Sequence, residues 1–376
     1  MIRIWDALVW ILVIIPLVTG GFWFKKPGLS IELSQINAPV ILLGVWAAVL
    51  HFRFRSSLKD ASSVRLASEL WAKWCDWTSR SPRVALWSGA LFFGLLMAWG
   101  AVQRHHGFGS HAEDLGIFSN TLWNLTHGNG YVSSLKDGIN LFQDHQSPIL
   151  LTFAPFFRLF PSPVTLLILQ ALALACGGPA LYFLFRQYRP EFDACRDPDV
   201  GGVFQTQRGF FQTYSPLLPL MYWSYLPTRN ANHFDFHPEV VMLPLYLWTV
   251  WALQSSRARV RMSGFFLLLL SLACKESAGI VAAGLGAAWV LGLGPKSTQR
   301  WTRPLGAAVS LLGIAHFLFC LKVVPGLLGS GYAYMSTYSH LGSSLGEVLL
   351  SPIQKPEIFW PLIFQKNRMV FLLGTL

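Results

Sequence analysis

Charged side chains are scarce in this chain. Lys, Arg, Asp and Glu make up 12% of its 376 residues, whereas hydrophobic residues make up 53%. Soluble domains carry about 25% charged residues, so this is the composition of a membrane protein. The net charge is +11, but no basic block is interleaved with aromatics. Nucleic acid is therefore not expected as a partner.

Cysteine motifs and a cleavable leader are also missing. The five cysteines are odd in number and form no CxxC pair, which argues against a disulfide framework and a thiolate metal site. No HExxH motif is present. The apolar run at 7–24 is followed by "FKKPG" and not by a small-residue cleavage site. We therefore interpret it as a retained helix.

Long apolar runs are abundant and predict an all-α fold, a polytopic bundle of about nine to eleven transmembrane helices. A crossing helix needs roughly 17–25 mostly apolar residues. A further run, 149–160, is either a span or a re-entrant piece. The predicted spans are 5–24, 39–54, 84–102, 164–185, 214–226, 240–253, 262–274, 279–293 and 305–324.

Two parts of the chain are predicted. Residues 1–83 form an N-terminal extension of two spans and a basic cytoplasmic loop, and residues 84–376 form the multispan membrane domain. The chain ends in an apolar run at 369–376 that is too short to cross a bilayer. We therefore expect further C-terminal spans to be missing.

The distribution of Lys and Arg predicts the orientation. Loop 51–83 holds seven of them, and the loops 186–213, 255–261 and 295–303 are also basic. Placing these loops and the N-terminus in the cytoplasm satisfies the positive-inside rule if 149–160 does not cross fully. The outer face then receives eight of the ten histidines and every polar cluster. The expected location is a bacterial cytoplasmic (inner) membrane.

The stretch "HFDFHPE" is the densest of these clusters. In an extended chain, alternate side chains share one face, so His233, Asp235, His237 and Glu239 would point the same way. Imidazoles and carboxylates in this arrangement are candidate ligands for a divalent metal ion. The alternative is a polar loop with amphipathic alternation.

The first outer loop contains "AEDLGIFSNTLWNL". Its apolar positions predict an amphipathic helix lying on the membrane, with Glu113 and Asp114 at its N-terminus. The simpler interpretation of Asp114 is a helix cap. The functional interpretation, which is compatible with it, is a carboxylate held at the membrane boundary and directed at a substrate.

Three further patterns combine polar and aromatic groups. The pair Asp144 and His145 has three interpretations: a general base positioned by a carboxylate, two metal ligands, or a solvated loop end. Lys275 and Glu276 lie between two apolar runs, where they face a polar cavity or form an ion pair with each other. Tyr332 and Tyr334 suit contact with a sugar or lipid headgroup, or an interfacial aromatic belt.

These motifs carry a resemblance to a known family. "DLGIFSNTLWN", "NLFQDHQSPILL", "FDFHPEV", "CKESAG" and "GYAYMSTYSHLGSSLGE" look like the successive signatures of the bacterial membrane proteins called domain of unknown function 2079. The resemblance covers roughly residues 90–370.

The arrangement is also similar, more loosely, to the C-type (GT-C fold) glycosyltransferases, which use polyprenyl-phosphate sugars. In that class the first outer loop carries an essential acidic residue and forms surface-lying helices. That position falls on Asp114 here, although the usual Asp–Glu or Asp–x–Asp pattern is replaced by "EDLG". The resemblance implies a GT-C-like core.

The implied activity is a hexosyl or pentosyl transfer at the outer face, with a polyprenyl-phosphate-linked sugar and the lipid bilayer as partners. Asp114 is the expected general base, and Arg229 and Lys275 are candidates for phosphate binding. Glu113, Asp144, His145, Glu276, Tyr332 and Tyr334 are expected to line the substrate site. The alternatives are a transporter or channel and a non-catalytic membrane scaffold. Convergence of the acids and imidazoles in one outward-facing cavity would favour the enzyme.

Overall fold

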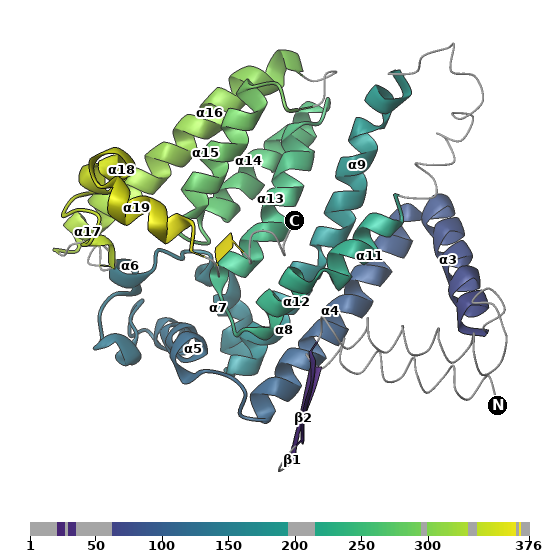
Figure 1. Cartoon of the computed structure of the whole chain (residues 1–376), viewed down its shortest axis with the longest axis horizontal. Coiled ribbons are helices and arrows are strands. Elements are labelled where there is room, and N and C mark those ends of the chain that lie inside the picture. Colours follow the sequence, from purple (N-terminus) through teal and green to yellow (C-terminus); the bar gives the residue numbers. More distant parts are fainter. Residues whose placement is uncertain are drawn as a thin grey trace.

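The computed structural model describes residues 21–26, 29–34, 62–194, 215–294, 299–329, 337–365 and 368–369. The regular elements among these residues are helices, apart from one pair of antiparallel strands (Figure 1). The strands are β1 (Gly21–Lys26) and β2 (Leu29–Ser34). The longer helices are α3 (Ser62–Arg80), α4 (Pro82–His106), α5 (Ala112–Thr126), α8 (Pro163–Ala175), α9 (Gly177–Ala194), α13 (Pro238–Leu253), α14 (Ala258–Leu272), α15 (Ala278–Val290) and α16 (Gln299–Leu318). The shorter ones are η3 (Ser134–Lys136), α6 (Leu141–Asp144), α7 (Leu150–Leu159), α11 (Leu217–Ser224), α12 (Leu226–His233), the π-helix η5 (Phe319–Val323), α17 (Val324–Leu327), α18 (Leu345–Gln354) and α19 (Pro356–Ile363).

The predicted all-α membrane fold is confirmed, but with fewer full-length spans than expected. Within the described residues, three helical stretches are long and apolar enough to cross a bilayer: Pro82–His106, Pro163–Tyr188 and Arg300–Leu327. The helices α13 and α15 are apolar but shorter. The predicted span at 214–226 is wrong, because α11 has only eight residues and ends before Tyr225. The run at 39–54 lies outside the described residues.

The predicted N-terminal helix at 5–24 is wrong at its C-terminal end. Residues 21–24 belong to β1, which pairs antiparallel with β2 from Gly21 opposite Ser34 to Lys26 opposite Leu29. The aromatic residues Phe22, Trp23 and Phe24 have high strand propensity. In the sequence, Pro27 and Gly28 follow them, a dipeptide that favours turns.

The main helices run along one direction, so that successive connections lie at opposite ends of the bundle (Figure 1). The connections 107–111, 234–237 and 273–277 are at one end, which we call the site end, and 254–257 is at the other. The ten residues of α7 reach about 15 Å at about 1.5 Å per residue, half of a roughly 30 Å hydrocarbon core. The segment 149–160 is therefore too short to cross.

The predicted amphipathic helix in the first long loop is present as α5, but its apolar face packs on protein. Leu115, Phe118 and Leu122 are buried in the core cluster that also contains Phe153 of α7 and Leu166 of α8. The expectation that this face rests on the membrane is therefore wrong. Burying it within the protein fixes where the acidic first turn of α5 is held.

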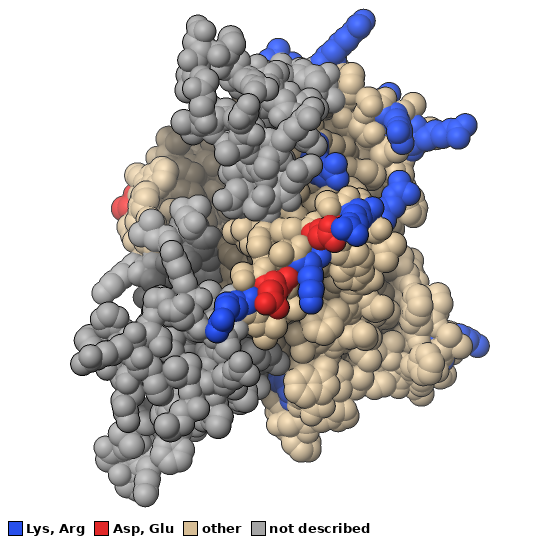
Figure 2. Space-filling model, turned by 90° about the vertical axis from the view of Figure 1, so that its right-hand side faces the viewer, with Lys and Arg blue, Asp and Glu red and all other residues tan. Residues whose placement is uncertain are grey.

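Helix α3 lies in the segment that was expected to be a basic loop. Figure 2 shows a row of alternating basic and acidic side chains on this side of the molecule, and α3 carries Arg65, Glu69, Lys73, Asp76 and Arg80 at spacings of three and four. Its other face is anchored to the bundle, because the Trp74 indole donates to the Pro216 carbonyl at 2.9 Å.

Glycine pairs bring α15 and α16 into backbone contact. A Cβ atom built on Gly286 would lie 2.3 Å from the Gly306 carbonyl oxygen, and one on Gly279 would lie 2.4 Å from that of Gly313. Both pairs are reciprocal and are seven residues apart on each helix. Small residues permit this approach between membrane helices.

We predict that Gly286→Val destabilises the protein by about 1–3 kcal/mol, because an overpacked contact forces the backbones apart. Gly284→Val is the matched control on the same helix, since a Cβ there meets nothing within 4 Å. The thermal unfolding midpoint of the purified protein measures both. Equal midpoints for the two variants would contradict a tight helix contact.

Candidate functional site

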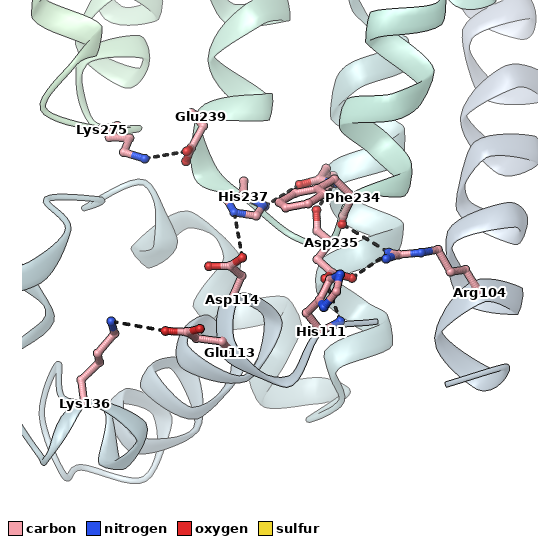
Figure 3. Close-up of polar contacts among 11 residues, drawn as sticks. Arg104, His111, Glu113, Asp114, Lys136, Phe234, Asp235, His237, Glu239 and Lys275 are labelled. Carbon is pink, nitrogen blue, oxygen red and sulfur yellow. Dashed lines mark hydrogen bonds and ion pairs between the residues drawn. The ribbon is translucent and has the colours of Figure 1, made fainter. Parts of the chain in front are cut away.

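Acidic and basic side chains from four separate segments meet at the site end (Figure 3). They come from the first turn of α5, the α6–α7 connection, the start of α13 and the α14–α15 turn. We call this group the polar cluster, and its members are Asp114, His145, His237, Glu239, Lys275 and Glu276. The sequence predicted that these groups lie on one side of the membrane, and the folded chain brings them together at one end of the bundle.

Asp114 faces His237. Its Oδ2 lies 3.4 Å from His237 Nε2, and the two side chains are 39% and 17% exposed. The capping interpretation is wrong, because His111 occupies the N-cap position of α5 and no side-chain cap bond forms. Asp114 sits in the first turn, where the helix dipole favours a negative charge. A partly exposed carboxylate beside an imidazole can accept a proton from a bound molecule.

One interpretation predicted an ion pair between Lys275 and Glu276. The two side chains do not form it. Lys275 Nζ lies 2.6 Å from Glu239 Oε1, whereas Glu276 Oε1 lies 3.9 Å from His145 Nδ1. Glu276 is buried, and its Oε2 also accepts the Gln146 backbone N–H at 3.4 Å. The α14–α15 turn thus sends two adjacent side chains to two different segments.

The surroundings of His145 favour its neutral form. Burial lowers its pKa below the usual 6.5, and the Lys275 ammonium lowers it further. The carboxylates of Asp144, Glu276 and Glu239 oppose this shift without reversing it. A neutral imidazole beside Glu276 can donate or accept a hydrogen bond.

Asp144 lies next to a lysine. Its Oδ2 lies 3.6 Å from Lys136 Nζ, and the same ammonium lies 3.9 Å from Glu113 Oε1. Asp144 is buried, whereas the Glu113 side chain is 78% exposed. Lys136 therefore adds a cation to the edge of the polar cluster.

Asp235 ties the first long loop to the bundle. Its buried carboxylate accepts from Arg104 Nη1 at 2.9 Å through Oδ1 and from the His111 backbone N–H at 2.9 Å through Oδ2. Arg104 also donates to the carbonyl of His233. The Gln170 amide bridges the Asp235 carbonyl and the His237 N–H, at 3.0 and 2.8 Å. These contacts set the position of His237 relative to Asp114.

The predicted shared face of "HFDFHPE" is wrong. Asp235 has a φ of +114°, so the strand-like alternation breaks there. Phe234 is exposed while Phe236 is fully buried. The three side chains have different partners: Asp235 contacts Arg104, His237 contacts Asp114, and Glu239 contacts Lys275. Among the described residues, no group of three or more His, Cys, Asp or Glu could hold a metal ion, so the proposed site at His233, Asp235, His237 and Glu239 is not formed.

Other residues fall differently from the sequence-based predictions. Arg229 lines a separate pocket with Phe93 and Trp223, and Lys275 is not among the residues of that lining. Tyr332 and Tyr334 lie outside the described residues. The sequence-based prediction missed Arg104, Lys136 and Gln170. Gln170 is the one polar residue in the stretch 166–175 of α8, which was a usable signal.

An apolar cavity of about 670 Å³ adjoins the polar cluster. It lies between α14, α16 and the segment 142–148, with Gln146, Leu272 and His316 among its lining residues. Gln146 is shared with the cluster through its bond to Glu276. His316 Nε2 lies 3.5 Å from Cys320 Sγ inside the cavity wall. A molecule with a polar head and an apolar chain would find both environments here.

Most of the chain matches a model of a known protein family. A family model described as "Predicted membrane protein (DUF2079)" matches residues 104–376. No curated protein and no solved structure matches the chain. The matched region contains every member of the polar cluster and Arg104, while α3 and most of α4 precede it.

We predict that Asp235→Ala lowers the stability by about 3–5 kcal/mol, because it leaves the Arg104 charge without its buried partner. Hydrogen exchange at the start of α5 should rise, since the His111 N–H loses its acceptor. The matched control is Asp76→Ala, which breaks an exposed ion pair with Arg80 and should cost less than about 1 kcal/mol. Unchanged exchange in α5 would remove the positioning role of Asp235.

We predict that stability falls as the pH drops below about 6.5, with a contribution from His145. Its pKa is lower in the folded protein, so the unfolded chain binds the proton first on acidification. The contribution is fully present above about pH 6.5 and is lost as the pH falls through the folded pKa. His145→Gln should flatten the dependence of the unfolding midpoint between pH 7.5 and 5. The control His340→Gln, at an exposed position, should leave this pH dependence unchanged.

Proposed function

The chain belongs to the DUF2079 family of predicted membrane proteins, and from that premise we propose that it is a membrane-embedded glycosyltransferase. In this proposal it transfers a sugar from a polyprenyl-phosphate donor to an acceptor at the outer face of a bacterial inner membrane. The observation that supports it most is the meeting of Asp114 and His237, from segments more than 120 residues apart, within a cluster of acids and cations.

Asp114 is the general base of the proposed reaction. The acceptor hydroxyl oxygen forms a bond to the anomeric carbon, and its proton passes to the Asp114 carboxylate. The bond between the anomeric carbon and the phosphate oxygen breaks, and the electron pair leaves with the phosphate. The transition state resembles an oxocarbenium ion. His237, 3.4 Å from Asp114, orients the carboxylate.

Lys275 supplies positive charge for the leaving phosphate. An ammonium group has three donors, and one of them is directed to Glu239 at 2.6 Å. Within the described part of the chain the ammonium has no second hydrogen-bond partner, so its other donors can reach phosphate oxygens, whose developing charge they would stabilise. Glu239 then holds the ammonium in place. Lys136, which contacts Asp144 and Glu113, is a second cation on the same side.

The apolar cavity suits the prenyl chain of the donor. Its lining is predominantly apolar, with Phe142, Leu269 and Leu312 among the residues. Its polar boundary is Gln146, which binds Glu276 of the cluster. A lipid whose chain occupies this cavity would present its phosphate towards the segments that carry Lys275 and His145.

A transport function fits the distribution of buried charge less well. It would require ionisable groups along a path between the two ends. Among the described residues, the buried acidic side chains are Asp144, Asp235 and Glu276, and all three belong to the segments at the site end. A cluster confined to one end is better suited to chemistry on that side.

The decisive experiment measures transfer from radiolabelled polyprenyl-phosphate sugars by membranes containing the protein. Asp114→Asn should lower the rate by about 10²–10⁴-fold, because the amide cannot accept the proton. Asp137→Asn is the matched control, since Asp137 is an exposed acid of the same outer loop.

Both variants must reach the membrane in wild-type amounts and unfold at the wild-type temperature. Transfer at the wild-type rate by Asp114→Asn would remove this residue from the role of base. Absence of transfer by the wild-type protein, together with ion flux in proteoliposomes that depends on Glu276, would favour the transporter instead.

A further inference from the structure

A second pocket opens beside α4, away from the polar cluster. Its volume is about 180 Å³. Its lining includes the α4 side chains Phe93, Leu96 and Met97. Trp223 of α11 and Arg229 and His233 of α12 also line it. It therefore combines an aromatic and aliphatic lining with a guanidinium group.

The Arg229 guanidinium is half-buried and lacks a hydrogen-bond partner at one end. Its Nη2 atom is shielded from solvent and has no partner within the described part of the chain. A buried charged donor without a partner is unfavourable, since it loses its hydration without compensation. Arg104 shows the usual alternative, because its Nη1 is bonded to the His233 carbonyl and the Asp235 carboxylate.

The shape and surroundings of this donor define the chemistry of a ligand. A planar guanidinium matches the oxygens of a phosphate group and binds them with two parallel hydrogen bonds. Positions on α4 adjacent to the pocket, Phe92, Leu95 and Trp99, are exposed on a helix long enough to span the bilayer. Apolar chains attached to the phosphate would lie against them.

We propose that Arg229 binds the phosphate group of an anionic ligand in this pocket, at a site separate from the polar cluster. The lining favours a phospholipid headgroup, and free inorganic phosphate shares the same chemistry. This site does not depend on glycosyl transfer, because the described residues that line its pocket include none of those assigned to that reaction. The Arg229 side chain, predicted from the sequence to bind the donor phosphate, thus serves a different site.

The experiment uses the full chain in mixed micelles and counts bound lipids by native mass spectrometry. The probes are phosphatidylglycerol, a diacylglycerol glycolipid with the same chains but no phosphate, and inorganic phosphate. The wild-type protein should retain phosphatidylglycerol in preference to the glycolipid. Arg229→Gln should weaken that retention about tenfold or more, since charged hydrogen bonds are lost. Arg158→Gln, which removes an exposed arginine from α7, is the matched control and should not.

Two additions keep the result interpretable. Arg229→Lys keeps the charge but not the fork of donors, so intermediate retention is expected even if the Gln variant folds poorly. Asp114→Asn should leave retention at the wild-type level, which separates this site from the proposed reaction.

Competition by millimolar inorganic phosphate, lost in Arg229→Gln, would support the anion site and identify free phosphate as a ligand. Equal retention by wild type, Arg229→Gln and Arg158→Gln, or no preference over the glycolipid, would overturn the proposal.

Discussion

The buried carboxylate of Asp235 is the contact on which the geometry of the site end depends. It joins the last turn of α4, through Arg104, to the backbone that begins α5, through the His111 N–H. A buried charge of this kind is stable only when its partners are in place. Because Asp235 is two residues from His237, the same contact fixes the distance between His237 and Asp114. The chemistry proposed for Asp114 therefore relies on a residue that touches no substrate.

The polar cluster is assembled from turns and helix ends that rest on a rigid core. Phe236 is fully buried between Phe118 of α5 and Phe153 of α7, with ring centroids 5.6 and 5.7 Å away. The Ile149 N–H donates to the Ala273 carbonyl at 2.9 Å, which joins the α6–α7 connection to the α14–α15 turn. Long-range contacts of this kind let short polar segments hold a defined arrangement.

The sequence is sufficient to predict an all-helical membrane fold and the gathering of polar groups at one end of the bundle. Apolar runs of about 20 residues and the asymmetry of Lys and Arg are strong signals. The sequence does not predict in the same way which polar side chains contact each other. Lys275 and Glu276 are neighbours that contact different segments, and Asp235 finds its cation 131 residues away. The predicted shared face of "HFDFHPE" was wrong because Asp235 has a positive φ, and its carboxylate contacts Arg104 and His111, which are distant in sequence.

The glycine contacts between α15 and α16 have a consequence for the apolar cavity. Two helices whose backbones touch at Gly279–Gly313 and Gly286–Gly306 move as a single body, because close-packed interfaces do not deform gradually. The α16 wall of the cavity is therefore stiff. Any widening that admits a bulky chain has to move α15 and α16 together, or else displace α14 or the segment 142–148. Since that segment carries His145 and Gln146, filling the cavity is mechanically linked to the arrangement of the charged groups next to it.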